Sequence, residues 1–117
     1  MTKQEMKVRT KKYALRIVKA VQALPNGRVG NVLGNQLLRA GTSVAANYRA
    51  VCRAKSAADF VNKLKIVEEE CDESLFWMEL LVESGVIAQS RFTNLMKEGD
   101  EILAIVVSAA KTTRASL

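Results

Sequence analysis

Eight basic side chains in the first half of the chain have the residue type and the spacing to bind phosphate groups. Lysine and arginine contacts to phosphates provide affinity and salt dependence but little choice of base sequence. Residues 1–55 contain twelve Lys or Arg and a single acid, Glu5, so this part of the chain is strongly basic. The candidate nucleic-acid-binding residues are Lys7, Lys11, Lys12, Arg16, Lys19, Arg49, Arg53 and Lys55.

The distribution of charge along the chain leaves two interpretations open. Residues 56–101 contain four bases and eleven acids, although the whole chain has a net charge of +6. The basic half either binds nucleic acid or pairs with the acidic segment, within one chain or between subunits. Its lysines are also consistent with an ordinary solvated helix face. Tyr48, which precedes Arg49, could stack on a base or pack at an interface.

No set of residues amounts to an active site. The chain has no histidine, which excludes a Ser-His-Asp triad, a Cys-His pair, a Glu-x-x-His di-iron site and a histidine-dependent ribonuclease. Glu70 and Glu73 could act as paired carboxylates or metal ligands on one helix face, but no second carboxylate helix accompanies them. Ser43 has no base, and residues 30–34 lack the Gly-Lys-Ser ending of a phosphate loop. We expect a protein that is not an enzyme and has no metal and no cofactor.

The two cysteines and the apolar runs indicate the compartment. Cys52 and Cys71 are isolated, and the N-terminal residues MTKQEMKVRTKK carry no secretion signal, so we expect reduced thiols in a cytoplasmic protein. The longest apolar run covers residues 102–107, far short of the roughly 20 residues that a membrane span needs. We expect a soluble protein that does not contact a membrane.

Four amphipathic helices must position these side chains. Apolar residues at spacings of three and four predict helices over about residues 2–24, 29–53, 57–84 and 90–114. Pro25 with Asn26 and Gly27 ends the first helix, Ser56 caps the start of the third, and Gly85 stops it. Because the connections are short, the sequence predicts an all-α, antiparallel up-down-up-down four-helix bundle, with residues 1–117 forming a single domain.

The second predicted helix carries small residues along one side. Gly34, Gly41 and Ala45 recur at helical spacing, and a glycine inside a helix costs about 1 kcal/mol relative to alanine. That cost predicts a close crossing with another helix. The apolar positions that we assign to the buried side of this helix are Val29, Val32, Leu33, Leu37, Ala40, Val44 and Val51.

The middle of the chain resembles a known family. The segment SVAANYRAVCRAKSAADFVNKLKIVEEECDESLFWMELL, residues 43–81, is similar to the four-helix-bundle proteins encoded in intervening sequences of bacterial 23S ribosomal RNA genes. With the Leu-Pro at residues 24–25 and the Leu-Leu-Arg before Ala40, the likeness spans about residues 13–85. The family pattern falls on Ser43, Asn47, Tyr48, Arg49, Ala54, Ser56, Asp59, Phe60, Glu70, Glu73, Phe76 and Trp77.

This resemblance implies an assembly and partners. The family is related to the accessory proteins of diversity-generating retroelements, which look like basic homopentameric barrels that bind nucleic acid and a reverse transcriptase. By resemblance, this protein would be a homopentamer that binds RNA or DNA. A reverse transcriptase would be a partner only if a retroelement lies nearby.

Two hypotheses follow for the function. In the first, a non-enzymatic oligomeric bundle binds RNA or DNA through the basic surface of the first two helices. In the second, the protein is an interaction scaffold whose basic first half pairs with the acidic third helix of a neighbouring subunit.

A polar stripe on the second helix needs partners if it is buried, or else it is open to water. It consists of Gln36, Ser43 and Asn47. We expect Ser43 and Asn47 to form a polar seam that faces Glu70 or Glu73, inside the bundle or across subunits.

Overall fold

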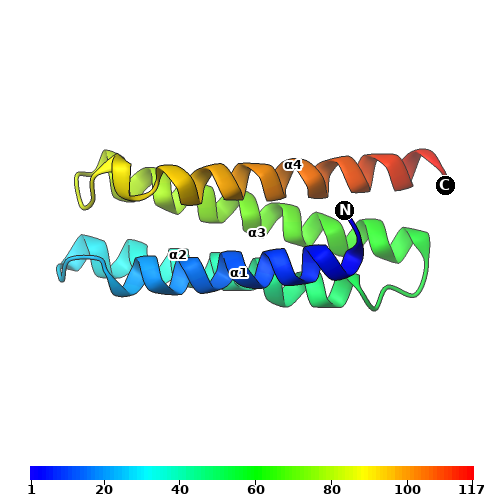
Figure 1. The fold of residues 1–117 in the computed structure, drawn as a ribbon, viewed down its shortest axis with the longest axis horizontal. Helices are drawn as coiled ribbons and strands as arrows, with labels where there is room; N and C mark the ends of the chain where they lie inside the picture. Colours follow the sequence, from blue (N-terminus) through cyan, green and yellow to red (C-terminus); the bar gives the residue numbers. More distant parts are fainter.

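Four long helices lie side by side and alternate in direction (Figure 1). The computed structural model describes residues 1–117 and contains α1 (Lys3–Gln22), α2 (Arg28–Val51), α3 (Ala57–Glu83) and α4 (Thr93–Ala115), with a short 3-10 helix, η1 (Gln89–Arg91), before α4. The bundle measures 47 × 20 × 19 Å, and both termini lie at the same end. The predicted all-α, up-down-up-down four-helix bundle is confirmed.

Local capping residues set the helix ends. The Ser56 hydroxyl accepts the backbone N–H of Asp59 at 3.0 Å, so the predicted cap of α3 is confirmed. Gly85 ends that helix with a φ of +83°, a left-handed conformation that favours glycine. Thr2 and Glu5 form a capping box at the start of α1 that the sequence pattern did not predict. The predicted fourth helix divides into η1 and α4.

The core lies along the bundle axis and receives side chains from all four helices. Ile17 of α1, Leu37 and Val44 of α2, Met78 of α3 and Ile102 of α4 are completely buried. Leu37 and Val44 belong to the buried side that the sequence predicts for the second helix. The repeat of apolar residues at spacings of three and four therefore located the buried side of each helix.

The prediction was wrong at the start of α2. Val29 and Val32 were expected to face inward, but they are 53% and 58% exposed. The buried side of this turn carries Gly30 and Gly34 instead, and an added Cβ at Gly34 would lie 2.9 Å from Leu24. Because Gly30 and Gly34 lie on the side of α2 that contacts neighbouring chain segments, Val29 and Val32 lie on the side that faces solvent.

The predicted close crossing joins α2 to α1. A Cβ added at Gly41 would lie 2.7 Å from both Cγ1 and Cγ2 of Ile17, which is closer than real carbon contacts allow. Gly34 provides a second close approach, toward the loop that follows α1. The α1 and α2 backbones can therefore pack closely only because these positions lack side chains.

A buried polar connection links α1 to α3 and packs against α4. The Tyr13 hydroxyl lies 2.9 Å from the Ser74 hydroxyl, which donates to the Cys71 carbonyl at 2.6 Å. The Tyr13 ring is buried and reaches Gly99 of α4, whose missing side chain leaves room for it. Burial raises the pKa of the Cys71 thiol to about 12, so this cysteine packs as a neutral side chain.

A half-buried ion-pair cluster also holds α1 against α4, the two neighbouring helices that contact each other least. The Arg9 guanidinium donates to both carboxylate oxygens of Glu98 at 2.8 Å and to Glu101 at 3.1 Å. These hydrogen bonds lower the pKa of the Glu98 carboxyl. No helix has an apolar stretch of the length needed to cross a membrane.

Candidate nucleic-acid interface

Four of the predicted cations line one groove between α1 and α2. Antiparallel packing places the beginning of α1 beside the end of α2, and the four-residue spacing on each helix puts both members of a pair on the same side. The resulting hollow has a volume of about 630 Å³. We call it the α1–α2 groove; it is lined by Lys7, Lys11, Ala45, Ala46, Arg49 and Arg53.

The four cations of the groove have no acidic partner within the chain. The five ion pairs of the structure use other residues: Arg9 binds Glu98 and Glu101, Arg39 binds Glu70 and Glu73, and Lys63 binds Asp59. The six residues that line the groove include no Asp or Glu. The groove therefore concentrates positive charge that remains available to an anion from outside the chain.

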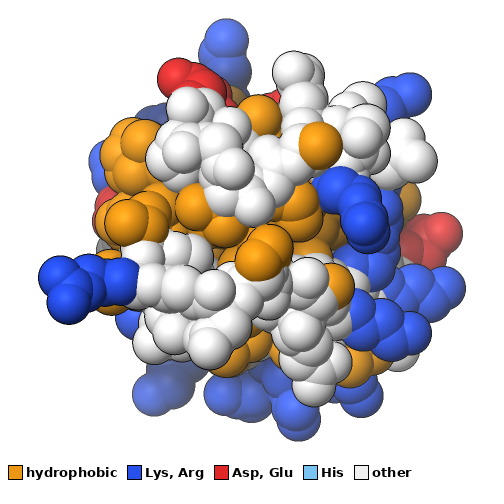
Figure 2. All heavy atoms as spheres, turned by 90° about the vertical axis from the view of Figure 1, so that its left-hand side faces the viewer, with side chains coloured by type: hydrophobic (Ala, Val, Ile, Leu, Met, Phe, Trp, Pro, Cys, Tyr) orange, Lys and Arg blue, Asp and Glu red, His pale blue; other side chains and the backbone are white.

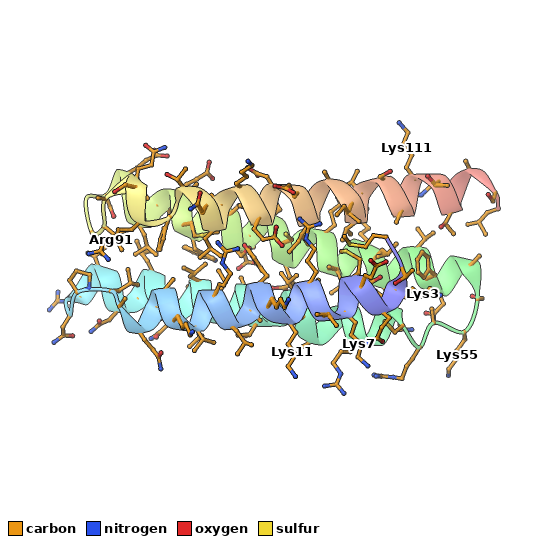
Figure 3. All side chains as sticks on the ribbon, in the orientation of Figure 1. Lys3, Lys7, Lys11, Lys55, Arg91 and Lys111 are labelled. Carbon is orange, nitrogen blue, oxygen red and sulfur yellow. The ribbon has the colours of Figure 1, made fainter.

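The remaining predicted cations lie elsewhere on the surface. Lys55 lines an adjoining hollow of about 450 Å³ at the α2–α3 corner, together with Lys3. Figure 3 shows Lys7, Lys11 and Lys55 projecting from the same edge of the bundle, whereas Lys111 projects from the opposite edge. The structure thus extends the basic edge toward the α2–α3 corner and adds Lys3, which the sequence reasoning missed.

Three further predicted cations do not contact the groove. Arg16 and Lys19 line a separate cleft of about 400 Å³, where α1 faces Arg91 and the start of α4. Lys12 lies with Arg9 on another side of α1. Because α1 carries basic residues around most of its exposed surface, the sequence could not separate these sides from the groove.

Tyr48 belongs to the core and not to the basic surface. Its side chain is 4% exposed, and burial raises the pKa of its hydroxyl. Tyr48 therefore packs inside the chain, which leaves its ring unavailable for stacking on a base; packing at an interface stays a prediction.

The predicted polar seam does not form within the chain. The Asn47 amide donates to the Ser43 carbonyl at 2.8 Å, one turn earlier on its own helix. Glu70 and Glu73 bind Arg39 instead. The part of the prediction that places the seam across subunits stays a prediction.

Arg39 replaces the seam because its side chain is long enough to span α2 and α3. It also donates to Gln36 at 3.3 Å, and the Trp77 indole donates to Glu73 at 3.2 Å. A signal was available in the sequence, since Arg39 lies three residues after Gln36 and four before Ser43, on the same side of the helix. Glu70 and Glu73, the two carboxylates that the sequence places on one face of a helix, are thus both bound to the Arg39 guanidinium.

The structure shows no cluster of three or more Cys, Asp or Glu side chains arranged to hold a metal ion. The two carboxylates considered for that role, Glu70 and Glu73, are ion-pair partners of Arg39. On the surface of α3, these two carboxylates connect α3 to α2 through Arg39.

Comparison with known proteins agrees with the fold and covers more of the chain than residues 13–85, where the sequence resemblance lies. No curated protein matches the chain. A crystal structure at 1.70 Å of a protein with unknown function from the S23 ribosomal protein family of Bacteroides thetaiotaomicron is similar, with 34% identity and a TM-score of 0.86. That alignment covers 95% of this chain and 99% of the other. The model of the 23S rRNA-intervening sequence protein family matches residues 2–108, from the cap of α1 into α4. The chain therefore belongs to the family of 23S rRNA-intervening sequence proteins.

Proposed function

We propose that this protein is a non-enzymatic binding protein that holds the phosphate backbone of RNA or DNA in the α1–α2 groove. The observation that carries the proposal is the gathering of Lys7, Lys11, Arg49 and Arg53 in one hollow, outside every ion pair of the chain. A backbone phosphate would supply the missing negative charge and displace counterions from the nucleic acid.

The wider surface supports the same proposal. Figure 2 views the bundle from the end away from the groove; Lys and Arg side chains are most numerous along its right-hand and lower sides, and others project at the left and the top. Such an excess of positive charge attracts a polyanion over a distance of about one Debye length and speeds its association.

The test is a fluorescence polarisation titration of structured RNA with the protein at several salt concentrations. We expect binding at low salt that weakens as salt rises. In a plot of the logarithm of the binding constant against the logarithm of the salt concentration, each phosphate contact should add about 0.7 to 0.9 to the downward slope. The double variant Arg49→Glu/Arg53→Glu should lower the affinity by on the order of 100-fold, since it reverses half of the groove charge.

The matched control for this titration is Lys97→Glu/Lys111→Glu. It makes the same change in net charge on exposed positions of α4 that neither line the groove nor form ion pairs. We expect it to reduce affinity only a few-fold, through the long-range field. Absence of binding at low salt, or equal losses in the two double variants, would contradict the proposed function.

A second candidate function is an interaction scaffold, in which a homo-oligomer forms and the basic half of one subunit meets acidic α3 of its neighbour. Two observations favour self-association. Ile66 and Phe76 of α3 are 46% and 48% exposed, and Phe76 makes an edge-to-face contact with Trp77. In addition, acids of α3 such as Glu69 and Asp72 are exposed and lie outside the ion pairs of the chain. The pentamer implied by the sequence resemblance remains the proposed assembly.

Light scattering on the wild type and on one double variant separates the two candidate functions. If the scaffold is correct, the wild type is a defined oligomer that nucleic acid does not alter, and Arg49→Glu/Arg53→Glu dissociates it. If the groove serves nucleic acid, the same variant keeps its assembly and loses only binding. Phe76→Glu should weaken self-association in either case, because it places a charge on the exposed apolar side of α3. A wild type that is monomeric at micromolar concentration would contradict the scaffold.

A further inference from the structure

We infer that the α1–α2 groove selects the backbone of a double-stranded nucleic acid and does not read base sequence. This inference rests on the proposed function and names the class of ligand for the same site. Three features of the groove carry it: the density of its cations, the chemistry of its floor, and the position of the nearby aromatic rings.

The cations form a compact square and not a long track. Lys7 and Lys11 are one turn apart on α1, as are Arg49 and Arg53 on α2, and a step of four residues is about 6 Å along a helix. Packed helices lie about 8–10 Å apart, which sets the other side of the square. A duplex presents one phosphate per roughly 1.7 Å of axis, twice the density of one strand at the same rise. A duplex can therefore bring phosphates to all four cations at once, whereas a single strand would have to fold back on itself to do so.

The groove has no amide or carboxylate side chain for reading a base. Apart from the four cations, only Ala45 and Ala46 line the groove. Short side chains let a sugar-phosphate backbone approach, whereas direct readout of adenine or cytosine uses amides or carboxylates that reach base edges inside a groove of the nucleic acid. Because all the polar side chains of this site are cations, which bind phosphates of any sequence, we expect similar affinity for duplexes of different sequence.

The aromatic rings near the groove already contact other side chains of the protein, so they are not free to stack on a base. Tyr48, one residue before Arg49, is buried. Phe60, in the adjoining hollow, lies under the Lys3 ammonium, whose nitrogen is 5.0 Å from the ring centre. Proteins that hold single strands without sequence preference gain much of their affinity by stacking bases on aromatic rings. A single strand would therefore gain only charge contacts here, and fewer of them than a duplex, whose bases are already stacked internally.

The edge of the bundle continues the groove in a direction that suits a straight rod. Lys7, Lys11 and Lys55 project along one edge of a bundle that is 47 Å long (Figure 3). A duplex of about 20 base pairs exceeds that length at 3.4 Å per base pair. Lys55 can thus add a further phosphate contact to the same duplex, beyond the four cations of the groove.

The test compares one labelled strand in two states. A labelled oligouridine of about 20 nucleotides is titrated alone and after pairing with its oligoadenosine complement, at low salt and then over a salt series. We expect the duplex to bind at least about fivefold tighter than the free strand, and an unlabelled mixed-sequence RNA duplex of the same length to compete within about twofold. A DNA duplex of the mixed sequence forms a third arm, and it shows whether the ligand is RNA, DNA or either.

The outcomes separate this inference from the proposed function. Tighter binding of the free strand, equal binding of the two states, or a difference of more than tenfold between the two RNA duplexes would overturn the inference while leaving the groove a nucleic-acid site. If none of these probes binds at low salt, the proposed function itself fails. The double variant Arg49→Glu/Arg53→Glu should remove the preference for the duplex, whereas Lys97→Glu/Lys111→Glu should retain it. Retention of that preference by the groove variant would place the duplex site elsewhere.

Discussion

Replacing Gly41 with alanine is expected to destabilise the bundle by about 2–3 kcal/mol, although alanine favours a helix by about 1 kcal/mol over glycine. The added Cβ would lie 2.7 Å from the Ile17 side chain. Ile17 is completely buried and branched at Cβ, so it cannot rotate away without disturbing the core. Either α1 must move away from α2 or the core must be strained. Urea unfolding followed by circular dichroism would measure the loss.

A control and a second-site change test the physical cause. Asn35→Ala, at an exposed position of the same helix, should be neutral or slightly stabilising, because it makes no new core contact. Adding Ile17→Ala to Gly41→Ala should produce a loss well below the sum of the two single losses, since the cavity left by isoleucine accommodates the new methyl. Additive losses, or a Gly41→Ala variant more stable than the wild type, would show that the α1–α2 approach is not close.

Gly41 also bears on the groove. It lies four residues before Ala45, which forms part of the groove floor. If Gly41→Ala separates α1 from α2, the distance between the two cation pairs increases as well. The variant should therefore bind nucleic acid more weakly than the wild type under conditions where both are folded, without any change in charge.

Replacing Gly99 with alanine is the second change for which we expect a loss of about 2–3 kcal/mol. The added Cβ would lie 2.8 Å from both the Tyr13 hydroxyl and a methyl group of Leu75. Displacing the hydroxyl would break its hydrogen bond to Ser74 in a region without water access. A thermal unfolding scan of this variant should show a clearly lower midpoint, whereas Ser108→Ala, at an exposed position of α4, should leave the midpoint almost unchanged.

The removal of the Tyr13 hydroxyl provides the cross-check. Tyr13→Phe alone should cost about 1 kcal/mol, the usual net contribution of one hydrogen bond. Combined with Gly99→Ala it should cost less than the sum, because the phenyl ring leaves the space that the new methyl needs. If the losses of the two single variants add fully in the double variant, the contact with Leu75 alone accounts for the loss at Gly99.

Much of the fold could be predicted because its signals are local. The apolar stripes, the Ser56 cap and the Gly85 stop each depend on residues within one or two turns of the chain, and all three were found in the structure. The Thr2 capping box was equally local and was overlooked. The error at Val29 and Val32 had another origin: apolar residues were expected to face inward, but nearby glycines occupied the contact with neighbouring segments.

The candidate site was predictable only in part. Basic composition identified the first half of the chain, and that half does contain the α1–α2 groove. The sequence could not show which four of the eight cations share a hollow, because α1 carries basic residues on several sides. Nor could residue spacing show that Arg39, and not Ser43 or Asn47, reaches Glu70 and Glu73. That contact depends on the length of a side chain and on how two helices are rotated against each other.

The sequence by itself determined four amphipathic helices, their order, their caps and the separation of basic from acidic segments, since each follows from short-range spacing and composition. Only the tertiary structure decided which sides of the helices meet. The rotation of each helix about its axis is set by close contacts between distant residues, as between Gly41 and Ile17 or Gly99 and Tyr13. Those contacts bring the start of α1 beside the end of α2, and the groove exists for that reason.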